Sequence, residues 1–165
     1  MRPVRSVLEG AVAGAVATGA MSSVMYGARR FGLMGRQPPT LIVRRFLPGG
    51  GTHRPRPGEG GLAVAAHLGF GAATGGLFGL LTGRRRPTVL TGVGYAMAVW
   101  GASYEGWVPA MGIQPPAHRD APHRVGTMAA AHVVFGATLA TALRRMRSDE
   151  GKRSAPGEAR TERGS

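Results

Sequence analysis

The hydrophobic and polar positions of this chain are segregated into long blocks. Asp, Glu, Lys and Arg are absent from four stretches of 18 to 24 residues, which are residues 10–28, 60–83, 87–104 and 125–143. An α-helix rises about 1.5 Å per residue, so about 20 residues cross the ~30 Å hydrocarbon layer of a membrane. A water-soluble helix would carry charges along its exposed face. The pattern predicts an all-α integral membrane protein with four transmembrane helices, at about residues 8–31, 62–83, 88–108 and 125–145.

Charged residues gather at the ends of these stretches, as at Glu9, at residues 29–30 and at residues 84–86. Placing Arg at the centre of a bilayer costs roughly 2.5–3.5 kcal/mol on insertion scales, which explains that distribution. The first stretch has an alternative interpretation as a cleaved signal peptide, because two arginines precede an apolar segment that ends in small residues. The internal repeat described next favours a retained helix.

The chain contains two short motifs that each occur twice and in the same order. The sequence MGRQPP at residues 34–39 returns as MGIQPP at residues 111–116, with five of six positions identical. The sequence AHLGFGA at residues 66–72 returns as AHVVFGA at residues 131–137, with five of seven identical. This order predicts two parallel helical-hairpin repeats, related by a pseudo-two-fold axis along the membrane normal.

The segments between the helices predict turns, one short helix and a tail. In each MGxQPP motif, Gly ends a helix and Pro-Pro cannot continue it, although a Gln-bearing loop that lines a site is a second interpretation. Residues 40–47 have apolar positions on one helical face, which predicts a short interfacial helix with Arg44 and Arg45 facing lipid headgroups. We expect residues 1–147 to form the membrane domain, with residues 48–61 as a linker and residues 148–165 as a disordered polar tail.

Glycine is abundant, with 28 residues, and its spacing predicts close helix packing. Small residues four apart let two backbones approach closely inside a membrane. Such grooves are used more often within one chain than between chains, and a homodimer through the Gly-rich helices is the alternative. The glycines expected at interhelical contacts are Gly71, Gly75, Gly79 and Gly136.

The net charge of +13 favours an anionic membrane surface as a partner. With both termini inside, 12 Lys and Arg residues lie inside and nine lie outside. The positive-inside rule therefore predicts cytoplasmic N- and C-termini. The lipid bilayer is the expected partner, and nucleic acid is excluded because the basic residues cluster at segment ends rather than along one face.

Two histidines occupy equivalent positions in the repeat and are the candidate functional residues. His67 and His132 are expected to point inward at matching depths. Three interpretations stay open: packing histidines that hydrogen-bond a carbonyl, ligands of a metal or a b-type haem, and a proton or ion path. Glu105 is expected to pair with Arg29 or Arg30 at the membrane interface and so to join the two repeats.

Sequence motifs of common enzymes are missing from the chain. It contains no GxxxxGK[ST], GxSxG or HExxH sequence, and it has no cysteine for a thiolate site or a disulfide. No cofactor and no catalytic residue are assigned from sequence. A non-enzymatic role is therefore expected.

Several of these motifs together resemble the YagU-like family of small bacterial inner-membrane proteins. The residues that carry the resemblance are GAVAT at 14–18, QPP at 37–39, Trp100, WVPA at 107–110 and the two AHxxFGA motifs. The resemblance spans roughly residues 8–143 and implies a four-helix protein of the cytoplasmic membrane. We expect a structural or stress-related membrane protein; the alternative is a small transporter or channel, or a haem- or metal-binding subunit that uses His67 and His132.

Overall fold

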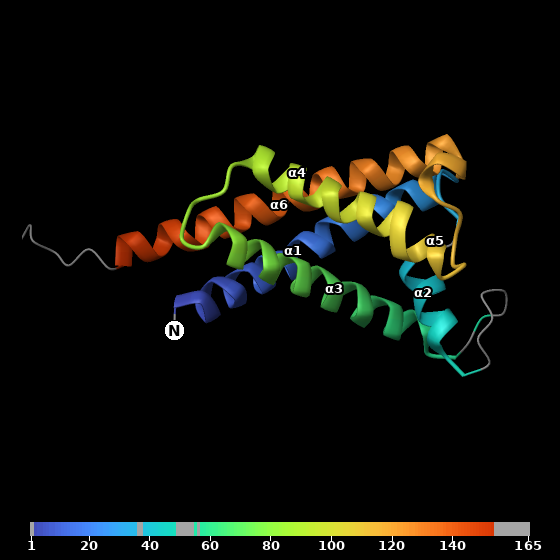
Figure 1. Ribbon diagram of the computed structural model, residues 1–165, viewed down its shortest axis with the longest axis horizontal. Helices are drawn as coiled ribbons and strands as arrows, with labels where there is room; N and C mark the ends of the chain where they lie inside the picture. Colours follow the sequence, from blue (N-terminus) through green and yellow to red (C-terminus); the bar gives the residue numbers. More distant parts are fainter. Residues whose placement is uncertain (1, 36–37, 49–54, 56, 154–165) are drawn as a thin grey trace, which may run out of the picture.

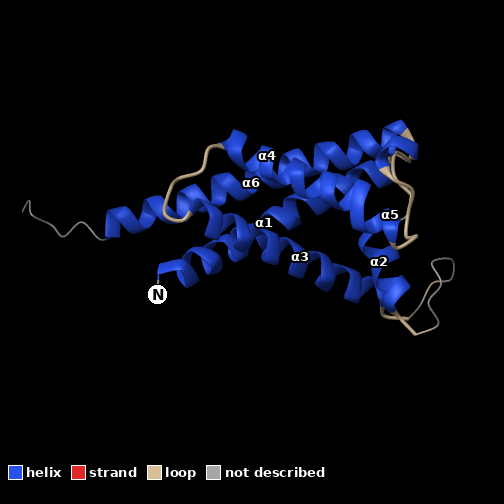
Figure 2. Ribbon diagram, viewed as in Figure 1, coloured by secondary structure: helices blue, strands red, loops and turns tan. Residues whose placement is uncertain are grey.

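The computed structural model describes residues 2–35, 38–48, 55 and 57–153 of the 165-residue chain. Every regular element in these ranges is helical (Figure 2). The predicted all-α class is therefore confirmed. The described part forms an elongated bundle in which the long helices run side by side (Figure 1).

Three helices are long and apolar enough to cross a membrane. They are α1 (Arg2–Arg30), α3 (Glu59–Thr82) and α6 (Pro122–Arg153). The 24 residues of α3 give a helix about 36 Å long, which exceeds the ~30 Å hydrocarbon layer. Large apolar side chains on the outer faces of these helices are exposed, as expected for surfaces that contact lipid.

The helix predicted at residues 88–108 is present but kinked, and it is not confirmed as a membrane span. The structure divides it into α4 (Val89–Gly101), a π-helical turn η1 (Ala102–Trp107) and the short α5 (Val108–Ala110). Gly106 leaves the helical region, with φ −103° and ψ −105°, and Pro109 follows without a backbone N–H. The number of candidate spans in the described residues is therefore three rather than four.

Helix α1 is the centre of the bundle, because it packs against both α3 and α6, while α4 packs against α6. Glycines make the closest crossings. A Cβ on Gly14 would overlap the carbonyl oxygen of Gly71, and a Cβ on Gly92 would overlap that of Gly136. Gly75 and Gly79 meet the backbone of α1 in the same way. Each half of the described chain thus contains one glycine crossing, between α1 and α3 in the first half and between α4 and α6 in the second.

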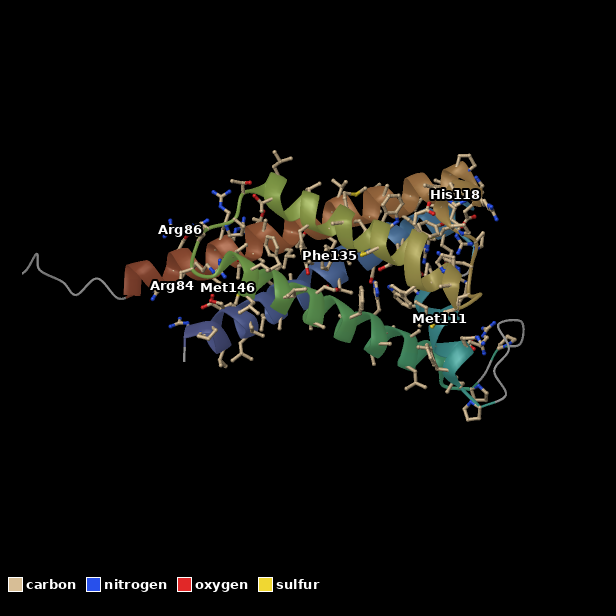
Figure 3. The ribbon with its side chains drawn as sticks, in the orientation of Figure 1. Arg84, Arg86, Met111, His118, Phe135 and Met146 are labelled. Atoms are coloured by element: carbon tan, nitrogen blue, oxygen red, sulfur yellow. The ribbon has the colours of Figure 1, made fainter. Side chains whose placement is uncertain are left out.

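The two ends of the bundle differ in chemistry. One end of the bundle holds the 83–88 loop, the N-terminal part of α1 and the C-terminal part of α6 (Figure 1). We call it the arginine end, because Arg84 and Arg86 lie there (Figure 3). The opposite end, where Met111 and His118 lie, is called the histidine end (Figure 3). It carries α2 (Pro38–Phe46), α5 and the turn η2 (Ala117–Arg119).

The short helix predicted at residues 40–47 is present as α2, but the expected exposure of Arg44 is wrong. Arg44 is buried and forms an ion pair with Glu59 at the start of α3, whereas Arg45 is exposed. The hydrogen bond to Glu59 raises the pKa of Arg44 above its ordinary value. This pair fixes α2 against the first turn of α3.

Two boundaries also differ from the expectation. Residues 148–153, predicted as part of a disordered tail, belong to α6, which continues to Arg153; the expectation for residues 154–165 lies outside the described residues. In the first MGxQPP region the glycine with a left-handed backbone is Gly32 (φ 71°), three residues before Gly35. In the second region it is Gly112 itself (φ 67°), and only there does the motif glycine end the helix as predicted.

Candidate binding cavity

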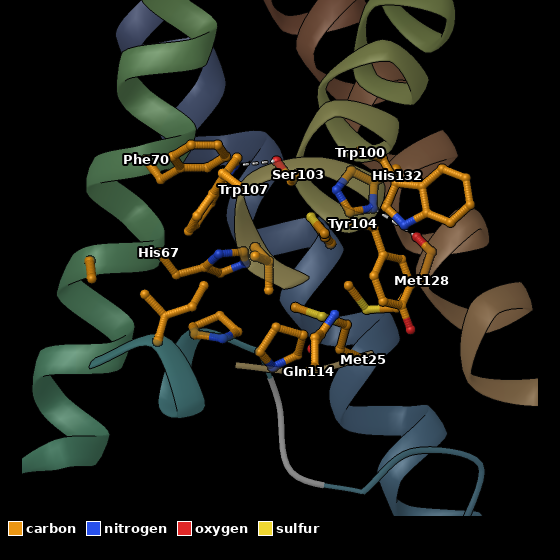
Figure 4. Close-up of a pocket in the computed structure, with 16 residues that line it drawn as sticks. Met25, His67, Phe70, Trp100, Ser103, Tyr104, Trp107, Gln114, Met128 and His132 are labelled. Atoms are coloured by element: carbon orange, nitrogen blue, oxygen red, sulfur yellow. Dashed lines mark hydrogen bonds between the residues drawn. The ribbon is translucent and has the colours of Figure 1, made fainter. Parts of the chain in front are cut away.

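A cavity of about 220 Å³ lies at the histidine end, between α3 and the opposing α4, η1 and α6. Helices α3 and α6 diverge toward this end (Figure 1). Helix α4 contacts α3 at Tyr95, whose hydroxyl donates to the carbonyl oxygen of Thr74 at 2.6 Å and whose ring lies 4.9 Å from that of Phe78. The space beyond this contact is lined mainly by apolar side chains together with both predicted histidines (Figure 4).

His67 enters the cavity from α3 and has an unsatisfied ring nitrogen. Its Nε2 atom is buried and has no hydrogen-bond partner among the described residues. Buried polar atoms in folded proteins are nearly always hydrogen-bonded, so this nitrogen requires an explanation. The prediction that His67 points inward agrees with its position in Figure 4.

His132 enters from α6 and is held in a defined orientation. Its Nδ1 lies 2.8 Å from the carbonyl oxygen of Met128, one helical turn earlier. A carbonyl oxygen can only accept, so Nδ1 carries the proton and donates it, and the neutral ring has its lone pair on Nε2. The Trp100 ring packs beside the imidazole, with centroids 6.2 Å apart.

Aromatic residues form one wall of the cavity. The Trp100 and Tyr104 rings meet edge to face at 5.8 Å, and the Phe70 and Trp107 rings lie 6.4 Å apart between α3 and η1. Trp107 donates from Nε1 to the hydroxyl of Ser103 at 3.2 Å, whereas the buried Nε1 of Trp100 has no partner in the described part of the chain. The π-helical turn η1 carries Trp107, whose ring contacts Phe70 of α3.

Polar contacts fix the loop that closes the histidine end. Asp120 accepts a hydrogen bond from the Tyr104 hydroxyl at 2.5 Å and forms an ion pair with Arg124 at 3.3 Å. Arg124 also donates to Oε1 of Gln114 at 3.2 Å. These contacts bring Gln114 of the second MGxQPP motif to the cavity, whereas Gln37 of the first lies outside the described residues.

A smaller space of about 40 Å³ continues from the histidines toward the glycine crossing of α1 and α3. It is lined by both His67 and His132 and also by Thr18, whose hydroxyl donates to the carbonyl oxygen of Gly14 at 2.8 Å. The two histidines therefore share two adjoining spaces. This arrangement agrees with the expectation from the repeat that both histidines point into the interior of the bundle.

The expected contact between Glu105 and Arg29 is absent from the structure. Glu105 instead accepts a hydrogen bond from the backbone N–H of His118 at 3.0 Å and lies 2.8 Å from its Nδ1. The π-helical turn directs the carboxylate toward η2 rather than toward α1. Arg30 lies over the ring of Tyr26 on its own helix, 5.0 Å from the ring centroid.

Three methionines that line the cavity were not predicted from the sequence. Met21 and Met25 come from α1 and Met128 comes from α6, and all three are buried. The signal that could have revealed them is spacing: Met21 and Met25 are one helical turn apart, and Met128 is one turn before His132.

Comparison with known proteins adds no assignment. No family model, no curated protein and no solved structure matches this chain.

Proposed function

We propose that this chain is a non-enzymatic, multi-pass protein of the cytoplasmic membrane that binds a small ligand between His67 and His132. The proposed fourth crossing is formed jointly by α4, η1 and α5, with both termini on the cytoplasmic side. The resemblance to the YagU-like family supports this location. The two-repeat interpretation is supported by the glycine crossing in each half.

The observation that carries the binding role is the buried Nε2 of His67, which has no partner among the described residues and lies at the wall of the cavity. A histidine that served only to lock helix packing would be expected to satisfy this atom. An unsatisfied buried polar group costs about 1–3 kcal/mol, so its presence favours a site that a ligand completes.

The character of the cavity argues against both an ion path and a haem site. Its lining is mainly apolar, which does not support a hydrated ion path. Its volume of about 220 Å³ also lies below the roughly 300–1,000 Å³ of sites for drug-sized molecules, which favours an occupant smaller than a porphyrin. A small ligand is the occupant that this geometry supports.

The test is to identify what the protein carries when it is extracted from membranes. The full chain, with an affinity tag that contains no histidine, is analysed by absorbance, elemental analysis and mass spectrometry. The same analysis is applied to a His67→Ala/His132→Ala variant and to a control, His118→Ala, on the exposed loop. Stoichiometric material lost only in the double variant supports the proposal. An empty protein whose double variant is merely less stable would contradict it.

A further inference from the structure

The cavity brings together an unusual set of side chains. Thioether sulfur comes from Met21, Met25 and Met128, and imidazole nitrogen comes from His67 and His132. Figure 4 shows both imidazoles and the side chains of Met25 and Met128 directed into one space. These groups are neutral, soft or borderline donors, and no carboxylate lies among the cavity-lining residues that the structure describes.

We infer, on the basis of the binding role proposed above, that this cavity is a site for one soft monovalent cation, Cu(I). Thioether and imidazole ligands favour Cu(I), whereas Mg²⁺, Ca²⁺ and Mn²⁺ prefer carboxylate and carbonyl oxygens. Binding is a ligation step in which copper stays Cu(I), so no oxidant or reductant takes part. The cation would be bound by the two imidazoles and by sulfur from Met21 or Met25, with Met128 as a further donor.

The charge of the site selects against divalent ions. The cost of moving an ion from water into an apolar medium rises with the square of its charge, and no ligand here carries a compensating negative charge. A monovalent ion therefore has a much smaller desolvation penalty than Zn²⁺ or Cu²⁺ would have in the same cavity.

The orientation of His132 matches that of a metal-bound histidine. Such histidines almost always donate their other ring N–H to a carboxylate, a carbonyl or water, which fixes the ring. His132 donates in this way from Nδ1 to the carbonyl oxygen of Met128. Its Nε2 lone pair is then available, and the unpartnered Nε2 of His67 supplies a second nitrogen.

The methionines explain how a cavity larger than one ion can close around it. Met has three rotatable side-chain bonds and adapts to irregular spaces. Met21 and Met25 both come from α1 and are one helical turn apart. Their movement would bring sulfur toward the ion without displacing a helix.

The experiment is a titration of the full chain in detergent with Ag(I), a redox-stable monovalent probe, and with Cu(I) under a reductant against a chromogenic Cu(I) chelator. Both tryptophans of the chain, Trp100 and Trp107, line the cavity, so their fluorescence reports occupancy. We expect one Ag(I) or Cu(I) per chain and no comparable binding of Zn²⁺.

The decisive variant is Met21→Leu/Met25→Leu, because a Met-to-Leu change nearly conserves volume and removes only the sulfur. We expect this double variant to bind Cu(I) and Ag(I) at least about tenfold more weakly. Loss of a side chain that only hydrogen-bonds a metal ligand already lowers metal affinity by that factor. Met146→Leu, at a partly buried methionine elsewhere in the core, should bind as the wild type does. Thermal unfolding of each variant shows that it is folded.

Two results would overturn the inference. One is equal binding by the wild type and the Met21→Leu/Met25→Leu variant. The other is a protein that takes up neither Ag(I) nor Cu(I) yet carries a different ligand through His67 and His132, which would leave the binding role intact and remove only the copper assignment. A protein with no occupant of any kind would contradict both proposals.

Discussion

Arg147 on α6 donates from Nε to Oε2 of Glu9 on α1 at 3.3 Å, although the two residues are 138 positions apart. The same buried guanidinium also donates to the hydroxyl of Thr82 at 3.3 Å and to the carbonyl oxygens of Gly79 and Arg85. Of these carbonyls, that of Gly79 lies in the last turn of α3, where it also accepts from the Thr82 hydroxyl, and that of Arg85 lies in the loop that follows. One side chain thus joins the three long helices at the arginine end.

Replacing Arg147 with Ala should therefore destabilise the bundle. The change leaves Glu9 with its ion pair to Arg5 and removes one donor from the carbonyl oxygens of Gly79 and Arg85. Loss of a partner by a buried polar group costs about 1–3 kcal/mol, which sets the expected loss in the free energy of unfolding. Unfolding in detergent, followed by circular dichroism, measures it. The exposed Arg144→Ala on the same helix should stay within about 0.5 kcal/mol of the wild type, and an equal effect of both changes would contradict the role of Arg147 in joining the helices.

The glycine crossing of α1 and α3 can be tested by two Gly-to-Ala variants of α1, one at the crossing and one away from it. Gly14→Ala would place a Cβ against the carbonyl oxygen of Gly71 and 2.9 Å from the Cα of Gly75. Such overpacking should destabilise the protein by about 1–3 kcal/mol. Gly19→Ala meets nothing within 4 Å and should stabilise α1 by up to about 1 kcal/mol, because Ala favours helix. Measured unfolding free energies that change in the same direction would contradict this packing.

Membrane orientation can be tested cleanly because the chain contains no cysteine. Single variants Arg86→Cys and Arg119→Cys place one thiol at each end of the bundle, and both positions are exposed. With the arginine end in the cytoplasm, a membrane-impermeant maleimide should label Arg119→Cys in intact cells. Arg86→Cys should be labelled only after permeabilisation. The reverse pattern would invert the proposed topology.

The long helices could be predicted because their signal is local. Blocks without charge identify α1, α3 and α6, and four-residue spacing identifies the small faces of Gly71, Gly75 and Gly79. The break after α4 is harder to predict, since Gly106 is tolerated in a helix. The π-helical turn is accompanied by tertiary contacts, such as that of Tyr104 with Asp120.

The candidate site was predictable only in part. The repeat points to His67 and His132, because it places them at equivalent positions. The repeat does not point to Met21 and Met25. Methionine on an apolar helix is usually a core residue, so these two gave no separate signal. The burial of Arg44 also depends on Glu59, 15 residues away across a linker, and no local pattern shows that they meet.

His67 serves ligand binding rather than helix packing in this proposal, and the free energy of unfolding of His67→Leu distinguishes the two roles. The measurement is made on chelator-treated protein in detergent beside the wild type. Because His67 Nε2 is buried without a partner among the described residues, its removal should leave stability unchanged or raise it by up to about 1–3 kcal/mol, while ligand binding is lost. A loss of stability greater than about 1 kcal/mol would show that His67 holds the helices together and would contradict the account.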